Sequence, residues 1–112
     1  RSWNILNRNV RGINSPTRWD DIRKKIDESA CCIMTFQETK RDNFDLAYIK
    51  NFCPKRYNQY CFSQSIGNSG GIITIWNGNM FKGEVMSQNY FHITIKFTSN
   101  LDNSCWYVTV WT

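Results

Sequence analysis

The spacing of hydrophobic and polar positions changes about halfway along this chain. In residues 1–56, two segments place apolar residues every three or four positions, which is the spacing of a helix that buries one face. Residues 57–111 instead hold short runs rich in β-branched and aromatic residues, separated by clusters of Asn, Asp, Ser and Gly. This order predicts strands alternating with helices in the first part and strands alone in the second.

Two helices are expected in the first part. The longer one begins at Ser15, a favoured N-cap residue, and continues with Pro16 at the first helical position. Its inward face carries apolar residues at helical spacing: Trp19, Ile22, Ile26 and Ala30. The shorter helix is capped by Asn43 and ended by Pro54. Its inward residues are also apolar: Leu46, Ile49 and Phe52.

Strands are expected before, between and after these helices, at residues 3–10, 30–36, 57–64, 71–76, 85–88, 91–97 and 105–111. The run 30–36 is apolar almost throughout, which is typical of a strand buried on both faces. The run 91–97 alternates and forms one apolar face: Phe91, Ile93, Ile95 and Phe97. Asn77-Gly78 predicts a tight turn, and residues 99–104 predict a hairpin. These elements assign the chain to the α/β (α+β) class.

Polar side chains follow the first two strands at their ends. The phrase I-L-N-R-N-V-R-G-I-N contains Asn9 and Arg11, and the phrase C-I-M-T-F-Q-E-T-K contains Glu38 and Lys40. In α/β sheets, functional groups gather where strands end at their carboxyl side. One carboxylate, one amide and nearby basic groups suit a divalent cation bound against a phosphate.

These two phrases resemble motifs of the endonuclease/exonuclease/phosphatase superfamily. The phrases G-N-S-G-G-I-I-T-I-W-N and W-Y-V-T-V-W follow in the family's order. The resemblance is closest to the apurinic-endonuclease-like domain of plant non-LTR (LINE-type) retrotransposons. It implies that residues 1–112 form a truncated, amino-terminal half of such a domain. The implied fold is part of a four-layer α/β sandwich, with one mixed sheet and two helices on its outer face.

The resemblance also implies a reaction and its residues. The family hydrolyses DNA phosphodiester bonds with Mg²⁺ or Mn²⁺, which makes Glu38 the metal ligand and places Asn9 beside the metal, both as catalytic residues. Arg11 and Lys40 are candidates for contacts to phosphate. Asn68, in the glycine-rich loop, is a candidate for a nucleic-acid contact. A non-catalytic nucleic-acid-binding remnant, or a phosphatase branch of the same superfamily, remains an alternative function.

Several departures from the family pattern weaken the case for activity. Arg8 stands where the family carries tryptophan before the first asparagine. Trp111 stands at the position of a family tyrosine, and an indole offers an N–H donor but no hydroxyl. The family's D-x-N motif, metal-side aspartate and closing S-D-H motif do not occur in this chain. Removing one such stabilising group costs about 10²–10³ in rate, so we expect no DNA cleavage. Because Glu38 is the only carboxylate ligand that the motifs identify, we also expect weak metal binding.

The stability of the chain by itself also follows from this resemblance. The family fold has two sheets packed face to face, and we assign the strands of this chain to one of them. The apolar positions of residues 91–97 and 108–110 would then lack a partner sheet. Leaving roughly 400–600 Å² of apolar surface in contact with water would cost on the order of 10–15 kcal/mol, which is comparable to the net stability of a domain. We therefore expect a molten or aggregation-prone chain.

Charge and composition narrow the choice of partner. The net charge is +5, from 14 basic and 9 acidic residues, and the excess lies within residues 1–56. A positive field on the half that carries Asn9 and Glu38 favours DNA as the partner, although Arg23, Lys24 and Lys25 could simply form a solvated helix face. Hydrophobic residues make up 41% of the chain, which is typical of a globular protein rather than a disordered one.

Cysteine usage and hydropathy bear on the cellular compartment. The five cysteines are an odd set without C-x-x-C pairs, which is typical of free thiols in a reducing environment. No run reaches the roughly 18 apolar residues that a membrane helix needs. No signal peptide precedes the first strand. These observations predict a nuclear or cytoplasmic, non-secreted protein without membrane association.

Overall fold

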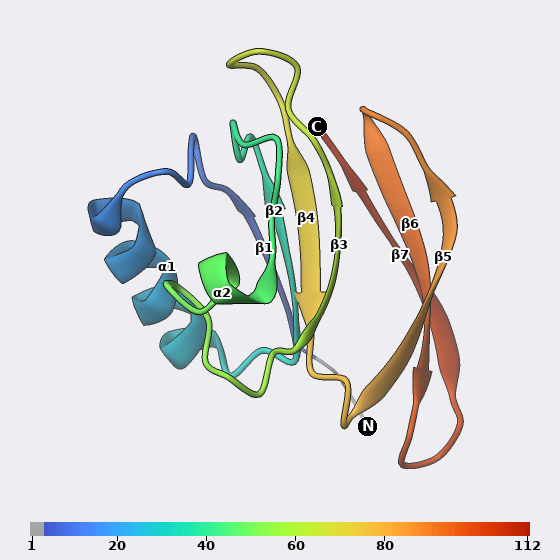
Figure 1. Cartoon of the computed structure of the whole chain (residues 1–112). Helices are drawn as coiled ribbons and strands as arrows, with labels where there is room; N and C mark the ends of the chain where they lie inside the picture. Colours follow the sequence, from blue (N-terminus) through green and yellow to red (C-terminus); the bar gives the residue numbers. More distant parts are fainter. Residues whose placement is uncertain (1–3) are drawn as a thin grey trace.

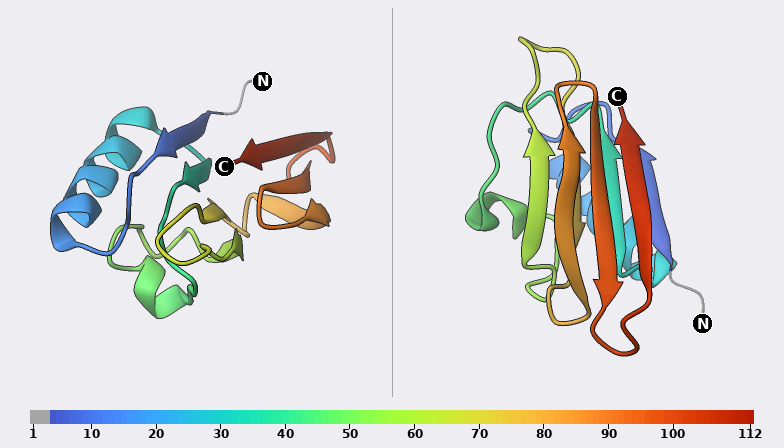
Figure 2. Two further views of the ribbon diagram at one scale, coloured as in Figure 1. Left: turned by 90° about the horizontal axis from the view of Figure 1, so that it is seen from above. Right: turned by 90° about the vertical axis from the view of Figure 1, so that its right-hand side faces the viewer.

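Two β-sheets face one another in the computed structural model, which describes residues 4–112, and helices cover the far side of one sheet (Figures 1 and 2). The elements are, in chain order, β1 (Ile5–Asn9), α1 (Pro16–Ser29), β2 (Ile33–Gln37), α2 (Leu46–Ile49), β3 (Gln59–Ser63), β4 (Ile72–Trp76), β5 (Phe81–Gln88), β6 (His92–Ser99) and β7 (Cys105–Trp111). Trp3, expected to begin the first strand, lies outside the described residues.

The first sheet has four strands in the order β1-β2-β4-β3. β1 and β2 run parallel, with Asn9 opposite Gln37, whereas β4 runs antiparallel to both of its neighbours. A parallel pair needs a crossover connection, and α1 provides it. The expected mixed sheet with two helices on one face is therefore confirmed, and the carboxyl ends of β1 and β2 meet at one edge of the sheet.

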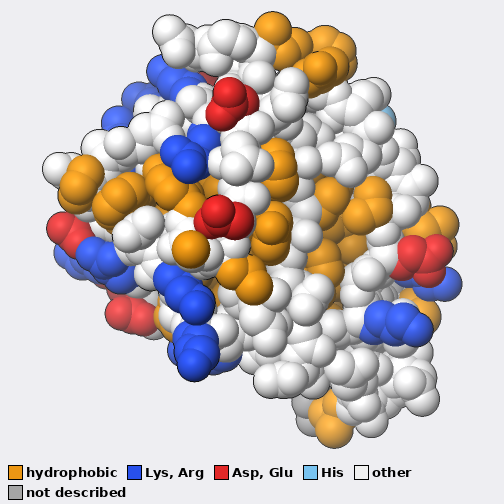
Figure 3. Space-filling view, viewed as in Figure 1, with side chains coloured by type: hydrophobic (Ala, Val, Ile, Leu, Met, Phe, Trp, Pro, Cys, Tyr) orange, Lys and Arg blue, Asp and Glu red, His pale blue; other side chains and the backbone are white. Residues whose placement is uncertain are grey.

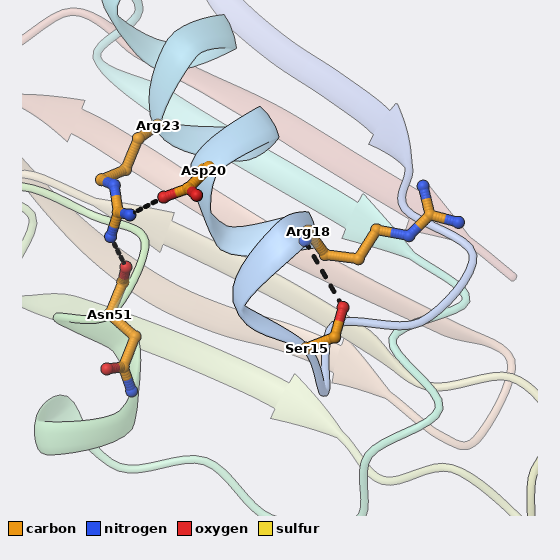
Figure 4. Close-up of polar contacts among 5 residues, drawn as sticks. All are labelled: Ser15, Arg18, Asp20, Arg23 and Asn51. Carbon is orange, nitrogen blue, oxygen red and sulfur yellow. Dashed lines mark hydrogen bonds and ion pairs between the residues drawn. The ribbon is translucent and has the colours of Figure 1, made fainter.

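The start of α1 agrees with the sequence expectation. Ser15 has an extended backbone and accepts a hydrogen bond from the backbone N–H of Arg18 at 3.4 Å, with Pro16 following it (Figure 4). The end of the helix differs. Ala30 is the C-cap, with a left-handed φ of 49°, and it is exposed rather than part of the inward stripe. The strand expected from residue 30 begins at Ile33 instead.

The second helix is shorter than the sequence suggested. It spans four residues, and its N-cap is Asp45 rather than Asn43, since the Asp45 carboxylate accepts from the backbone N–H of Tyr48 at 2.8 Å. Ile49 is buried as expected, but Leu46 is 39% exposed, so its expected inward position is wrong. Leu46 is the first residue of this single turn and lies at its exposed amino end.

The second sheet is a meander of three antiparallel strands in the order β5-β6-β7. β5 begins at Phe81, four residues before the expected start, and its register shifts between Val85 and Ser87. Gly83 allows β5 to pass close to Trp76, because a β-carbon at this position would lie 2.4 Å from a ring atom of Trp76. The missing side chain lets β5 cross the indole closely.

Apolar side chains fill both interfaces of this three-layer arrangement. The core between the helices and the first sheet includes Ile26, Phe36 and Phe52. The core between the two sheets is formed by these residues: Cys32, Ile33, Ile72, Trp76, Phe81, Ile93, Ile95, Phe97 and Val110.

The expectation that the apolar face of residues 91–97 would lack a partner is wrong. Ile93, Ile95 and Phe97 have no exposed surface, because the seven strands divide into two sheets that bury each other's inner faces. Phe91 is an exception to the expected apolar set. It precedes β6 and is 59% exposed.

All five cysteines are free thiols. Cys31, Cys32 and Cys53 are buried, Cys61 is half-buried and Cys105 is exposed. Burial raises the pKa of the Cys32, Cys53 and Cys61 thiols above its ordinary value. Neither helix in the described part of the chain combines the length and apolar character required to cross a bilayer.

The exposure of the thiols predicts their reactivity. We expect Cys105 to react rapidly with a thiol reagent at mildly alkaline pH and the other four to react slowly, since only the accessible thiolate is nucleophilic. A colorimetric titration of the native protein should show one fast thiol, and Cys105→Ser should remove it. All five should react in denaturant. A fast phase that survives in Cys105→Ser would show that the sheets are open to solvent.

Candidate active site

The loops after β1 and β2 lie at one end of the sandwich, beside the β3–β4 loop, the β5–β6 turn and the end of β7 (Figure 1). Backbone hydrogen bonds join the first two loops. Val10 N–H donates to the Gln37 carbonyl at 3.0 Å, Gly12 N–H to Glu38 at 2.7 Å, and Ile13 N–H to Thr39 at 3.0 Å. These bonds extend the parallel pairing past the ends of both strands, so the segments carrying Asn9 and Glu38 are fixed side by side.

The glycine-rich β3–β4 loop holds the segment after Glu38 from its other side. Thr39 N–H donates to the Gly71 carbonyl at 3.1 Å, and Lys40 N–H donates to Gly70 at 2.9 Å. A β-carbon at Gly71 would lie 2.2 Å from the Thr39 hydroxyl oxygen, so the two loops touch. The Glu38 segment is therefore the central one of three connected loops, which together we call the rim (residues 9–14, 37–41 and 64–71).

Unusual backbone conformations concentrate in the rim. Arg11, Glu38 and Lys40 have positive φ angles of 51°, 54° and 54°. A residue with a side chain pays about 1–2 kcal/mol for this left-handed conformation. Such strain persists only where the surroundings fix it, and it is common at functional sites. Glu38 directly follows Gln37, the last residue of β2, so this conformation marks the point where the regular strand ends.

Asn9 ends β1 with a side chain-to-backbone hydrogen bond. Its Oδ1 atom accepts from the backbone N–H of Arg11 at 3.2 Å, a turn-forming hydrogen bond that is common for asparagine. Its Nδ2 group donates to no other described residue and remains available to a ligand. Asn9 shares a face of β1 with Asn7, whose Oδ1 accepts from the Thr35 hydroxyl at 2.9 Å. This face is directed toward the second sheet.

Glu38 is half-buried, and its carboxylate forms no ion pair or hydrogen bond with the described residues. The rim thus offers a cation one carboxylate and the amide oxygen of Asn9. No cluster of three or more His, Cys, Asp or Glu side chains occurs anywhere in residues 4–112. Mg²⁺ keeps several waters and commonly binds one or two carboxylates together with substrate phosphate. The donors present fit such a weakly held ion, not a closed metal site.

Two basic residues flank the Asn9 and Glu38 segments. Arg11 and Lys40 are both exposed. The Lys40 side chain extends from the loop after β2 toward the loop after β1. A β-carbon at Gly12 would lie 3.7 Å from its Cδ atom. Their assignment to phosphate contacts stays a prediction, and their position beside Glu38 is compatible with it.

The other two candidates lie farther from this centre. Asn68 is exposed at the tip of the β3–β4 loop, within a turn closed by the bridge between Ile66 and Ser69. Trp111 is 60% exposed and packs against His92 with tilted rings whose centroids are 4.7 Å apart, on the face of β7 opposite the buried Val110. The structure thus brings four candidates together, sets Asn68 on an adjoining loop, and turns Trp111 toward solvent.

Thr39 is a rim residue that the sequence analysis did not single out. It is completely buried, and its hydroxyl has no hydrogen-bond partner among the described residues. A buried hydroxyl without a partner carries a desolvation penalty of about 1–3 kcal/mol. The only sequence signal was its place between Glu38 and Lys40. Its contact with Gly71 fixes the spacing between the two loops.

No protein-family profile matches this sequence, and no curated protein matches it. Solved structures do match the fold. AP endonuclease LMAP from Leishmania major superposes with a TM-score of 0.72 at 11% identity, over 98% of this chain and 40% of that one. An AP endonuclease from Archaeoglobus fulgidus gives 0.58 at 21% identity, over 88% and 38%. The catalytic domain of Xenopus laevis APE2 gives 0.60 at 17% identity, over 95% and 43%.

These matches agree with the superfamily resemblance at the level of the fold. The mixed four-stranded sheet, the facing three-stranded sheet and the helices on one side recur in AP endonucleases. This chain spans about two fifths of the length of the endonucleases it matches. The protein therefore has an AP endonuclease-type fold over that part of their length.

Proposed function

We propose that this chain is part of a metal-dependent endonuclease that hydrolyses DNA phosphodiester bonds, of the non-LTR (LINE-type) retrotransposon kind. The observation that supports it best is the joining of the Asn9 and Glu38 segments by the hydrogen bond between Gly12 N–H and the Glu38 carbonyl. It occurs on a fold shared with AP endonucleases. The N-V-R-G and G-N-S-G-G phrases favour the retrotransposon branch over the phosphatase branch.

Four rim residues have a role in this proposal. Glu38 would hold Mg²⁺ or Mn²⁺, which supplies Lewis-acid polarisation of a phosphoryl oxygen when bound. Asn9 would donate from Nδ2 to a non-bridging phosphate oxygen and so orient the phosphodiester. Arg11 and Lys40 would neutralise charge on the scissile phosphate or its neighbour, and charged donors to phosphate are stronger than neutral ones.

The distribution of charge supports DNA as the partner. Most Lys and Arg side chains on the face drawn in Figure 3 lie over the helices and the first sheet, with fewer over the second sheet. This agrees with the excess of basic residues in the first 56 positions. Neutralisation of phosphates dominates affinity for DNA. The free state of all five thiols supports a reducing compartment, which we propose to be the nucleus or the cytoplasm.

A binding role without catalysis is the second candidate. It is favoured by the single carboxylate at the rim and by the absence of a cluster of metal-binding side chains among the described residues. Both candidates require DNA binding, and they differ in whether Glu38 binds a metal ion. The two experiments that follow separate them.

Magnesium should bind this chain weakly, with a dissociation constant above about 0.1 mM, because few protein oxygens are available at the rim. An NMR titration with MgCl₂ should shift the amide signals of residues 37–41. Glu38→Gln should abolish these shifts. Glu84→Gln, which removes an exposed carboxylate from β5, should leave them unchanged. Equal shifts in both variants would refute a metal role for Glu38, and micromolar affinity would reveal further ligands.

The chain by itself should not cleave abasic-site or plasmid DNA above background in magnesium. The family's general base and further phosphate-stabilising groups do not occur in its sequence. Gel assays would measure cleavage, and a shift assay in EDTA would measure binding. Cleavage that is lost in Glu38→Ala and kept in Glu84→Ala would overturn the expected inactivity. Failure to bind DNA at low salt would contradict both candidate functions.

A further inference from the structure

A second polar site lies between β1 and α1, on the helix side of the first sheet. It is a cavity of about 110 Å³ with an apolar floor formed by Val10, Ile22 and Phe36. All three floor residues are buried. The cavity has several times the roughly 30 Å³ that one water molecule occupies, so a small tetrahedral anion can enter it.

Basic side chains line this cavity from two elements. Arg8 comes from β1, on the face that also carries the buried Leu6 and Val10 and that is therefore directed toward α1. Arg18 and Lys25 come from α1. They are seven residues apart, so they stand on one face of the helix about 10 Å from each other. Figure 4 shows the Arg18 side chain extended away from the helix toward the end of β1.

These cations are not neutralised within the described part of the chain. The one acidic residue at the cavity is Asp21, which leaves a net charge of +2. Asp21 forms no ion pair with a described residue, although it lies three and four positions from Arg18 and Lys25. The contrast is Arg23 on the same helix, which pairs with Asp20 and also donates to the Asn51 carbonyl (Figure 4).

We propose that Arg8, Arg18 and Lys25 form a phosphate-binding pocket on the helix side of the first sheet, at the end of β1, where Asn9 also lines the cavity. A net charge of +2 matches a phosphate dianion. Guanidinium groups bind phosphate oxygens in a bidentate manner, and an apolar floor strengthens charge-assisted hydrogen bonds by limiting solvent. The occupant is a phosphate group, either free or terminal, or one within a nucleic-acid backbone. The pocket does not depend on metal binding at Glu38.

The test is an NMR titration of the full chain with sodium phosphate, compared with sodium chloride at equal ionic strength. Phosphate should shift amide signals of residues 8–10 and 18–25 to saturation, and chloride should not. Arg8→Gln and Arg18→Gln should each weaken binding by about tenfold or more, the scale of one charge-assisted hydrogen bond. Lys24→Gln removes an exposed charge from the same helix outside the pocket and should not weaken it. The spectrum of each variant also reports whether it is folded.

Two oligonucleotides distinguish the source of the phosphate. Saturating binding of a 5′-phosphorylated oligonucleotide, but not of its 5′-hydroxyl counterpart, would support a terminal phosphate. Equal, Arg8-dependent binding of both would support a backbone phosphate. Shifts that rise linearly with phosphate concentration, or that are identical in Arg8→Gln and Lys24→Gln, would overturn the proposal and leave a solvated basic surface.

Discussion

Replacing Phe97 with alanine should lower the free energy of unfolding by about 3–5 kcal/mol, the range for deleting a buried phenylalanine. Phe97 has no exposed surface and lies between the two sheets. Its ring meets Trp76 at 5.1 Å, Phe81 at 6.2 Å and Trp106 at 6.3 Å between centroids. Small domains have a total stability of about 5–15 kcal/mol, so this variant should lose much of its stability in a denaturant titration.

The neighbouring residue on the same strand provides the control. Thr98 is half-buried on the opposite face of β6, so Thr98→Val should change the free energy of unfolding by no more than about 0.5 kcal/mol. Similar small losses in both variants would show that the sheets do not pack face to face.

Since the inner face is covered, we expect the unaltered chain to unfold cooperatively. A non-cooperative transition would instead support the molten state that we expected from the sequence.

Gly71→Ala should be the most damaging change at the rim, costing about 2–4 kcal/mol. Gly71 has a φ of +92°, and a β-carbon would lie 2.2 Å from the Thr39 hydroxyl oxygen and 3.3 Å from the Lys40 backbone nitrogen. Because Thr39 is buried, it cannot move aside without shifting the segment that carries Glu38. Denaturant unfolding should show the lost stability, and the amide signals of residues 38–40 should move.

Gly67 in the same loop is the matched control. Its φ is +60°, but no atom lies within 4 Å of the position of a β-carbon. Gly67→Ala should therefore cost only the strain of a left-handed alanine, about 1 kcal/mol, and should leave the signals of residues 38–40 in place. Equal losses in the two variants would mean that the contact between Gly71 and Thr39 is not tight.

The parts of the fold that the sequence predicted correctly depend on local chemistry. Ser15 and Pro16 mark the start of α1 through capping and a fixed φ, and both signals lie within adjacent residues. Other features depend on packing between elements, since a glycine is needed at position 83 of β5 because the Trp76 ring lies against it. The position of the α2 cap also could not be predicted from nearby residues. Asn43 and Asp45 are both suitable capping residues, so the sequence does not distinguish them, and the structure has Asp45 as the cap.

The candidate site was also predictable only where it depends on features that are close together in the sequence. The proximity of the Asn9 and Glu38 segments could be predicted because each stands at the carboxyl end of an expected strand, and parallel pairing brings such ends together. The contact of Thr39 with Gly71 could not be found, because it depends on a loop more than thirty positions away in the printed sequence. The alternation of residues 91–97 likewise identified an inner face but carried no information about which strands cover it.

The connectivity of the two sheets has a consequence for the order of folding. The strands β5, β6 and β7 follow one another along the chain and need only short hairpin closures. By contrast, β2 pairs with β4 by joining Ile33 to Trp76, across α2 and β3. Closing long loops is slow because the entropy is lost before the contact forms. We therefore expect amides of β6 to gain protection from hydrogen exchange before those of β2, so that the apolar face of the meander becomes the template on which the site-bearing sheet assembles.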